Sequence, residues 1–233
     1  MIPKVIHYCW FGRGPKPEKI QKCIDSWSKI MPDYEIKEWD EDNWDVRKHL
    51  YTSQAYDVKK YAFVSDYARY DILFNNGGIY LDTDVELLKS LDPIVQEGKP
   101  FGGLDSSSGW FTSGLGMGGP RHSKIFNLIR LDYCCSTAVD KFGKIRYNTN
   151  VSHEISIMSR LGIKRGSNEI QEVGGMVLYP KEYFCPIDFI TNKINITDNT
   201  YSIHHYTCTW MPKEMIDDLI KRYPELKERY SNN

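Results

Sequence analysis

Two aspartates separated by one residue, Asp82 and Asp84, follow a short apolar segment, residues 79–81. Because side chains alternate along an extended strand, both carboxylates would face the same side as Tyr80. Two carboxylates this close need a cation, and oxygen ligands suit Mg²⁺ or Mn²⁺, whose remaining ligands a diphosphate can supply. Acidic pairs are more often simply solvated on loops. Here the apolar strand and the glycine pair 77–78 before it favour a metal site.

A second polar pair, Asp66 and Arg69, precedes the aspartates. It lies in residues 57–76, the clearest helix of the sequence, which the glycine pair would end. Three residues apart on a helix, the two side chains share one face. One interpretation is an exposed ion pair worth less than about 1 kcal/mol. The other is a fork that holds sugar hydroxyls, in which the aspartate accepts and the arginine donates hydrogen bonds; the residues alone leave both open.

The N-terminal elements predict where these side chains are placed. Residues 4–11 are typical of a buried strand, residues 17–32 of a helix between two prolines, and residues 34–39 of a second strand. Strand, helix and strand in this order open a parallel-sheet nucleotide-binding fold. Open sheets of this kind bind ligands at the carboxyl ends of their strands, which is where the two aspartates would lie.

The rest of the chain has weaker patterns. We expect strands at 100–104 and 110–117, helices at 122–135 and 151–161, and a last helix that starts at Pro212 and is interrupted at Pro224. The glycine-rich stretch 114–119 lacks the lysine of a P-loop and is interpreted as a turn. No linker or repeat divides the 233 residues, which therefore predict a single α/β domain.

Composition excludes several classes of protein. A formal net charge of −1 argues against a nucleic-acid binder. Six cysteines without a C-x-x-C pair argue against a zinc cluster or a disulfide framework. Neither a signal peptide nor a run of about 18 apolar residues is visible, so we expect a cytoplasmic protein. The basic residues of the last helix would form a solvated face, with peripheral contact at the inner face of the cell membrane as the alternative.

Residues 65–84, which contain both polar pairs, resemble the DXD sugar-transferase family. That family includes yeast initiating α-1,6-mannosyltransferases and bacterial capsule and lipopolysaccharide transferases, and it is related to the glucosyltransferase domains of large clostridial toxins. Residues 6–12 are similar to its opening strand and residues 203–210 to its closing His-His motif. The three matches cover both ends and the middle of the chain.

The resemblance implies a fold, a reaction and its partners. The fold would be of the GT-A type, a Rossmann-like mixed sheet flanked by helices in one domain, 1–233, whose segment 201–233 closes over the donor. The donor would be a nucleotide sugar, UDP favoured over GDP, bound with Mn²⁺ or Mg²⁺. A hexose or N-acetylhexosamine would pass, with retention of configuration, to a hydroxyl of a glycan or lipid-linked glycan acceptor. The pathway would be surface polysaccharide biosynthesis, of capsule or lipopolysaccharide.

Carried over by position, the resemblance also assigns roles to residues. Trp10 would stack on the base, Tyr80 would lie near the ribose, and Trp210 would cover the donor. The donor-binding set is His7, Trp10, Ser65, Asp66, Arg69, Tyr80, Asp82 and Trp210. The catalytic set is Asp66, Arg69, Asp82 and Asp84. The metal ligands would be Asp82, Asp84 and His205.

The closing motif departs from the family pattern. Tyr206, Cys208 and Thr209 stand where relatives commonly have Trp, Gly and Ser. Since His204 and His205 are adjacent, they would point to opposite faces of a strand, and at most one would reach the metal. A Thr-Gly-Pro segment common in the family has its nearest equivalent in residues 149–151, so no acceptor-side contact is carried over.

Two rival functions use the same residues. A nucleotide-sugar hydrolase would need the same metal and diphosphate platform, and product analysis would separate it from a transferase. A degenerate, non-catalytic binding module is the second rival, and a failure to bind nucleotides in the presence of Mn²⁺ would favour it. The intact site residues Asp66, Arg69, Asp82, Asp84 and Trp210 argue against such a module.

Overall fold

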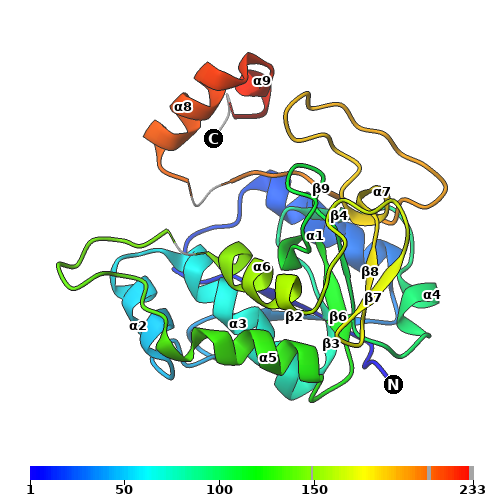
Figure 1. The fold of residues 1–233 in the computed structure, drawn as a ribbon, viewed down its shortest axis with the longest axis horizontal. Coiled ribbons are helices and arrows are strands. Elements are labelled where there is room, and N and C mark those ends of the chain that lie inside the picture. Colours follow the sequence, from blue (N-terminus) through cyan, green and yellow to red (C-terminus); the bar gives the residue numbers. More distant parts are fainter. Residues whose placement is uncertain (148, 209–210, 231–233) are drawn as a thin grey trace.

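The computed structural model describes residues 1–147, 149–208 and 211–230. Its centre is a seven-stranded sheet in the order β2-β1-β3-β6-β5-β8-β7, with a separate pair, β4 and β9 (Figure 1). The large sheet comprises β1 (Val5–Cys9), β2 (Glu35–Trp39), β3 (Gly78–Tyr80), β5 (Phe101–Gly103), β6 (Met117–Gly119), β7 (Gln171–Val173) and β8 (Met176–Tyr179). The pair comprises β4 (Val85–Leu87) and β9 (Ser202–His204).

Helices flank the sheet. The longer ones are α1 (Glu18–Ile30), α2 (Leu50–Asp57), α3 (Tyr61–Asn76), α5 (Lys124–Asp132), α6 (Asn150–Arg160) and α8 (Lys213–Arg222). Single turns form α4 (Asp92–Val95), α7 (Lys181–Phe184) and α9 (Lys227–Tyr230), and 3₁₀ turns form η1 (Ser113–Leu115), η2 (Tyr133–Cys135) and η3 (Pro224–Leu226). Figure 1 shows α3, α5 and α6 grouped together.

The strand directions confirm the expected mixed sheet flanked by helices. Strand β1 runs parallel to both β2 and β3, as the opening strand-helix-strand pattern predicts. Strand β6 is antiparallel to both of its neighbours, and β5 and β8 are parallel. The parallel half therefore carries the motif at the carboxyl end of β3, and the antiparallel β6 lies beside it.

Two hydrophobic clusters pack around the elements. One contains Tyr70 of α3 and Phe126 of α5, and the other contains Trp27 of α1. Successive residues of β3 alternate between them, with Ile79 in the second cluster and Tyr80 in the first. This alternation is expected for a strand that is buried on both faces.

The link from α3 to β3 requires glycine. Gly77 and Gly78 have φ angles of 68° and 99°, a region that side chains disfavour. A Cβ on Gly78 would lie 2.8 Å from the carbonyl oxygen of Val5. The glycine pair therefore lets β3 enter the sheet against β1, and it fixes α3 relative to the motif.

Several sequence predictions differ from the structure. Residues 110–117 do not form a strand, because Phe111 makes a single bridge to Leu104 and η1 follows. The stretch 114–119, interpreted as a turn, instead completes η1 and forms β6. Strands β4, β7 and β8 and helix α2 were not predicted; three of them span only three or four residues, too few for a periodic pattern.

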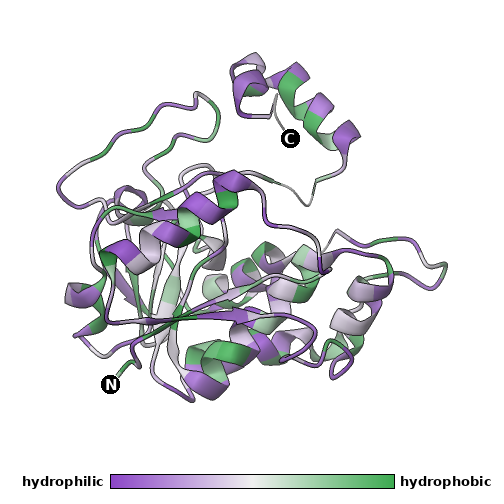
Figure 2. Ribbon diagram, turned by 180° about the vertical axis from the view of Figure 1, so that it is seen from behind, coloured by the Kyte–Doolittle hydropathy of each residue, from purple (hydrophilic) through white to green (hydrophobic). Residues whose placement is uncertain are grey.

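The C-terminal segment begins with β9, which pairs with β4 so that Val85 lies opposite His204. Helix α8 starts after Pro212 and η3 starts at Pro224, as predicted, and Figure 2 shows both polar and apolar residues on α8. None of the residues of α8 is buried. Within the described residues, no helix is long and apolar enough to cross a membrane. Trp210 lies outside the described residues, and the closure of segment 201–233 over a donor stays a prediction.

Candidate active site

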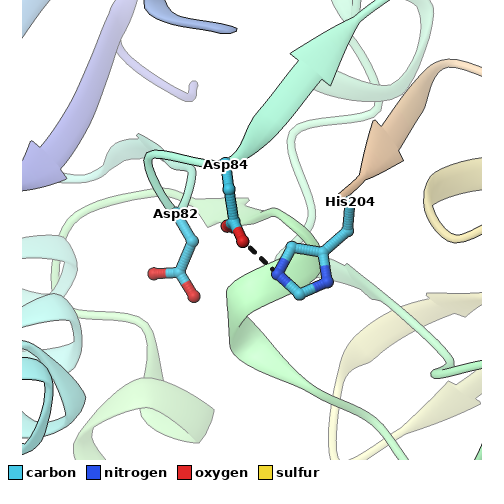
Figure 3. A group of neighbouring side chains, drawn as sticks. All are labelled: Asp82, Asp84 and His204. Atoms are coloured by element: carbon cyan, nitrogen blue, oxygen red, sulfur yellow. Dashed lines mark ion pairs between the residues drawn. The ribbon is translucent and has the colours of Figure 1, made fainter. Parts of the chain in front are cut away.

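The two motif aspartates occupy a turn rather than a strand. Strand β3 ends at Tyr80, and the backbone N–H of Val85 donates to the carbonyl of Asp82 at 3.0 Å, which closes the turn before β4. The expectation that both carboxylates share one strand face is therefore wrong in detail. They nevertheless converge, because ligand atoms of Asp82, Asp84 and His204 all lie within 4.8 Å of one another (Figure 3).

Asp82 is held from the side of α3. Arg69 lies 3.2 Å from Asp82 Oδ1 through Nη2 and 3.1 Å from Asp66 Oδ1 through the same nitrogen. The Tyr80 hydroxyl donates to Asp82 Oδ1 at 3.1 Å, and the guanidinium of Arg69 stacks over the Tyr80 ring at 4.9 Å. The Asp66–Arg69 pair is thus a buried ion pair that reaches the motif, and the exposed-pair interpretation is excluded.

Two residues of η1 complete this side. The Ser113 hydroxyl lies 3.1 Å from Arg69 Nη1 and accepts a hydrogen bond from it. A Cβ on Gly114 would lie only 2.3 Å from Asp82 Oδ2. Residue 114 must therefore be glycine for the carboxylate to stay in place, because real Cβ atoms do not approach so closely.

A buried carboxylate, Glu154 of α6, supports η1 from behind. It accepts hydrogen bonds from Ser113 Oγ at 2.5 Å, Tyr70 Oη at 2.6 Å and Asn150 Nδ2 at 3.0 Å. The backbone N–H of Asn150 in turn donates to Asp66 Oδ2 at 3.1 Å. Helix α6 thereby fixes both ends of the Asp66–Arg69 pair.

The charges on this side are unbalanced. Asp66, Asp82 and Glu154 surround a single cation, Arg69, and three of the four are almost wholly buried. Burial raises the pKa of Asp66 to about 7, although Arg69 opposes the shift. Burial also raises the pKa of Glu154, against the hydrogen bonds from Ser113 and Tyr70. A bound polar ligand with hydroxyl donors would suit these acceptors.

Asp84 is held from the opposite side, by the chain around β9. Its Oδ1 lies 3.2 Å from His204 Nε2, and its Oδ2 accepts from both the backbone N–H and the hydroxyl of Thr207, at 2.9 and 2.8 Å. Burial alone would raise the pKa of Asp84, but His204 and Thr207 hold it well below its usual range. Asp84 is therefore an ionised carboxylate ready to bind a cation.

The cluster of Asp82, Asp84 and His204 fits a divalent metal. Two carboxylate oxygens and an imidazole nitrogen are a ligand set that Mn²⁺ accepts. The other ring nitrogen of His204, Nδ1, is buried and has no hydrogen-bond partner among the described residues, so it too is available to a ligand. The residues present therefore suit a metal that also binds a diphosphate.

His205, the expected metal ligand, is not in this cluster. Its Nε2 lies 2.9 Å from Glu86 Oε2, on the other side of β9 from His204. Neighbouring strand residues face opposite ways, and the register that sets His204 opposite Val85 decides which one faces the motif. The structure thus replaces His205 by His204 as the third candidate ligand.

The remaining predicted donor-binding residues, His7, Ser65 and Trp10, differ in their surroundings. Both ring nitrogens of His7 are bonded within the core, Nε2 to the Gly77 carbonyl and Nδ1 to the Trp39 indole N–H, which argues against a contact between His7 and a donor. Ser65 contributes its carbonyl to Arg69 Nε at 3.1 Å. Trp10 follows β1 and is half-buried, with its indole N–H on the Gly14 carbonyl.

Sequence reasoning missed four residues on the α3 side and one on the β9 side. Their positions carry only weak signals, such as the glycine-rich stretch around η1 and the polar start of α6. A small residue beside a buried carboxylate has no sequence pattern of its own. The missed residues are Ser113, Gly114, Asn150, Glu154 and Thr207.

Residues 17–99 match the family model described as "Glycosyltransferase sugar-binding region containing DXD motif". They include both polar pairs. This part of the chain, called the DXD region, is similar to such sugar-binding regions. The DXD region thus joins the buried Asp66–Arg69 pair and the two motif aspartates, whereas His204 lies outside it.

Two proteins of known sequence are similar to part of this chain. Inositol phosphoceramide mannosyltransferase 3 of Schizosaccharomyces pombe is 36% identical over 108 residues, which cover 40% of this chain and 27% of that protein. The uncharacterized glycosyltransferase L373 of Acanthamoeba polyphaga mimivirus is 36% identical over 103 residues, covering 41% and 40%. The matches span less than half of either relative.

Among solved structures, the PaToxG glycosyltransferase resembles this one with a TM-score of 0.49 and 21% identity, over 69% of this chain and 70% of that chain. A likeness this loose shows nothing about substrates. The function is inferred from the site and from the DXD region.

Proposed function

We propose that this chain is a metal-dependent, retaining glycosyltransferase that uses a nucleotide-sugar donor. The observation that carries the proposal is the arrangement of Arg69, which bridges Asp66 and Asp82 while Asp82 converges with Asp84 and His204. A sugar-binding pair and a metal-binding cluster thereby share one residue, Asp82. A nucleotide sugar needs both, because its sugar and its diphosphate are joined through one oxygen.

Each side of the site has a role in this proposal. Asp66 accepts hydrogen bonds from sugar hydroxyls, and Arg69 donates them while it keeps Asp82 in place. Their burial excludes water, which strengthens the contacts and holds the anomeric carbon toward the acceptor hydroxyl. Asp84, ionised and fixed by Thr207, anchors the diphosphate end through the ion.

A divalent ion held by Asp82, Asp84 and His204 would neutralise the negative charge that develops on the leaving diphosphate. The protein supplies the ligands in a partly prepared form, because Asp84 is already ionised and already aimed at the cluster. We favour Mn²⁺ or Mg²⁺, since two of the three candidate ligands are oxygen atoms.

Retention of configuration is part of the proposal. Asp66 has both carboxylate oxygens engaged, one by Arg69 and one by the backbone of Asn150, so it is poorly placed to act as a nucleophile. An attack of the acceptor on the same face that the diphosphate leaves needs no protein nucleophile. NMR of the glycosidic product determines its anomeric configuration directly, and a product with inverted configuration would exclude a retaining reaction.

The sugar and acceptor classes are proposed more broadly. The family resemblance favours a UDP-linked hexose or N-acetylhexosamine, and the name of the fission-yeast relative adds mannose as a candidate. The acceptor is proposed to be a hydroxyl of a glycan or lipid-linked glycan of the cell surface, such as capsule or lipopolysaccharide. We propose that the whole chain, 1–233, works as one such unit in the cytoplasm.

A thermal-shift screen with UDP and GDP, each with and without Mn²⁺, tests the proposal. Ligands that bind the native state raise the melting temperature, so a shift with one nucleotide only in the presence of Mn²⁺ is expected. Asp84→Asn should lose this shift, whereas Glu86→Gln, a carboxylate two residues away, should keep it. Absence of any shift in the parent protein would point to a non-catalytic module.

Turnover then separates a transferase from a hydrolase. With a glycan acceptor present, the expected product is a new glycoside, and nucleoside diphosphate release should depend on the acceptor. Free sugar released at the same rate without acceptor would instead establish a hydrolase. In either case the Asp84→Asn protein should fall at least about a hundredfold in turnover, because the ion loses its most buried ligand.

A further inference from the structure

A hairpin of residues 138–147 holds an aromatic side chain in solvent between α5 and α6. Phe142 at its tip is 83% exposed, the largest exposed fraction of any aromatic residue in the described part of the chain. An exposed phenylalanine on a loop is ordinary when the loop is loosely packed. This hairpin, however, is anchored at its base and braced at its tip.

The base of the hairpin is packed into the protein. Ala138 is buried and its N–H donates to Gln54 Oε1 of α2 at 3.0 Å, and Ile145 packs against the hydrophobic cluster. Val139 and Ile145 form an antiparallel bridge, and the N–H of Arg146 donates to the Ala138 carbonyl at 2.8 Å. The inward residues are thus fixed, and the tip is presented outward.

The tip is braced by Asp140. Its Oδ1 accepts from the N–H groups of Phe142 and Lys144, at 2.8 and 2.9 Å, and its own N–H donates to the Lys144 carbonyl. Gly143, with φ of 78°, lets the chain reverse there. These bonds hold Phe142 in place without burying it.

Basic residues flank Phe142 along the hairpin, and Lys141 Nζ lies 4.9 Å from the centre of its ring. Lys141, Lys144 and Arg146 are all exposed and lie within four positions of Phe142, against one acid, Asp140. Lys60 adds a further positive charge at the base, where its Nζ lies 5.7 Å from the ring of Tyr147. An exposed aromatic side chain with basic residues close to it is complementary to a bilayer with anionic headgroups. The aromatic ring inserts among the lipids while the basic side chains stay at the headgroups.

We propose that the 138–147 hairpin docks the protein on an anionic lipid surface. Tyr147 packs edge-on against Phe63 of α3, one helical turn before Asp66, with ring centroids 6.1 Å apart. The base of the hairpin therefore lies next to the helix that carries the sugar-binding pair. A membrane held by the tip would bring lipid-linked hydroxyl compounds toward that side of the molecule. The docking itself does not depend on the proposed transfer reaction.

Co-sedimentation with vesicles tests the docking without reference to activity. The full chain is expected to bind phosphatidylcholine–phosphatidylglycerol vesicles more tightly than vesicles of phosphatidylcholine alone, and less tightly in 1 M than in about 0.1 M salt, where charges are less screened. Phe142→Ser should weaken binding roughly tenfold, and Lys141→Gln with Lys144→Gln roughly ten- to thirtyfold. All variants lie outside the site, so the melting temperature should be unchanged.

Two matched controls sharpen the test. Ile170→Ser removes an exposed apolar residue (51% exposed) elsewhere, and Lys221→Gln with Arg222→Gln removes two cations from α8. Both should leave vesicle binding within twofold of the parent protein. Docking through the hairpin is overturned if the parent protein ignores anionic vesicles, or if Phe142→Ser binds as the parent does. A larger loss from the α8 variant than from the hairpin lysines would place the contact on α8 instead.

Discussion

Asp82 and Asp84 are two residues apart in sequence but belong to two differently built halves of the site. Asp82 contacts Arg69 of α3 and Tyr80 of β3, and Arg69 is held in turn by Ser113 of η1, which Glu154 of α6 binds. Asp84 faces His204 and Thr207, more than a hundred residues further along the chain. The turn between β3 and β4 is the place where the two halves meet.

The two halves also differ in their electrostatics. The α3 half gathers three carboxylates around one arginine, and burial, helped by the charges of Asp82 and Glu154, raises the pKa of Asp66 to about 7. In the β9 half a single carboxylate receives three favourable contacts and its pKa is lowered. The difference teaches that a short acidic motif need not act as a unit: Asp82 connects the Asp66–Arg69 pair to the candidate metal cluster, whereas Asp84 belongs to the cluster alone.

The largest effect is expected from breaking the α3 half at Arg69. Arg69→Met would leave Asp66 and Asp82 without their cation in a buried environment, and the free energy of unfolding should fall by about 3–5 kcal/mol. Urea denaturation followed by tryptophan fluorescence measures the loss. Arg222→Met, which removes the exposed partner of Asp218, is the control and should cost less than about 1 kcal/mol.

If the free energy of unfolding of Arg69→Met lies within about 1 kcal/mol of that of the parent protein, the buried ion pair does not stabilise the fold as proposed. If the variant does not fold, Arg69→Lys keeps the charge but loses the forked geometry. It should fold, and it should bind the donor more weakly, since lysine cannot contact two carboxylates in the bidentate way of a guanidinium.

Substitution of the two histidines tests which of them binds the metal in the β9 half. His204→Gln should raise the Mn²⁺ concentration needed for half of the nucleotide-dependent thermal shift by about ten- to a hundredfold, because His204 lies beside both carboxylates. His205→Gln is the matched control. It should change this Mn²⁺ concentration less than twofold, since His205 contacts Glu86 rather than the cluster. The reverse pattern would restore His205, the residue that the sequence favoured, as the ligand.

A substitution at Gly114 with a smaller expected effect tests whether the position of the Asp82 carboxylate, and not only its charge, matters for turnover. Gly114→Ala keeps every charged group but places a methyl group 2.3 Å from Asp82 Oδ2, so the carboxylate must move. We expect turnover to fall roughly tenfold with little change in melting temperature, because a displacement near 1 Å is costly for a positioned group. Gly14→Ala, which adds a methyl group in open space, should be silent.

Local sequence patterns could predict much of the α3 half but little of the β9 half. Helix α3 and the glycine pair that ends it follow from composition and spacing, and the shared face of Asp66 and Arg69 follows from helical geometry. The contact of Arg69 with Asp82 was not predicted, and it arises because the motif follows α3 after only a short strand. Ser113 and Glu154 were missed, since they reach the pair from distant segments that show no periodic signal.

The choice between His204 and His205 shows where sequence alone stops. Alternation along a strand predicts that only one of them faces the motif, and this is what the structure shows. Which one depends on the pairing register of β9 with β4, and β4 itself was not predicted. A shift of one residue would exchange the two histidines, and three-residue strands carry too little pattern to fix a register.

The smallest expected effect is a pH dependence of the free energy of unfolding that arises from Asp66 in the α3 half. A carboxyl whose pKa is raised on folding stabilises the folded state fully below its unfolded pKa, near 3.9, and loses that contribution as pH rises through about 7. Asp66 should therefore cost the protein roughly 1 kcal/mol of stability between pH 6 and pH 8. Asp66→Asn cannot lose a proton, so its destabilisation relative to the parent should shrink by that amount across this range.

Asp71→Asn is the control for this pH prediction, because Asp71 is also buried on α3 but has a lowered pKa and stays ionised across the range. Burial raises that pKa, and the hydrogen bond and charge of Lys48 more than compensate. Titration of His204, whose pKa is raised because Asp84 outweighs burial, occurs in all three proteins and cancels in the differences. A constant difference for Asp66→Asn would show that Asp66 does not titrate between pH 6 and pH 8, which would contradict a pKa raised to about 7.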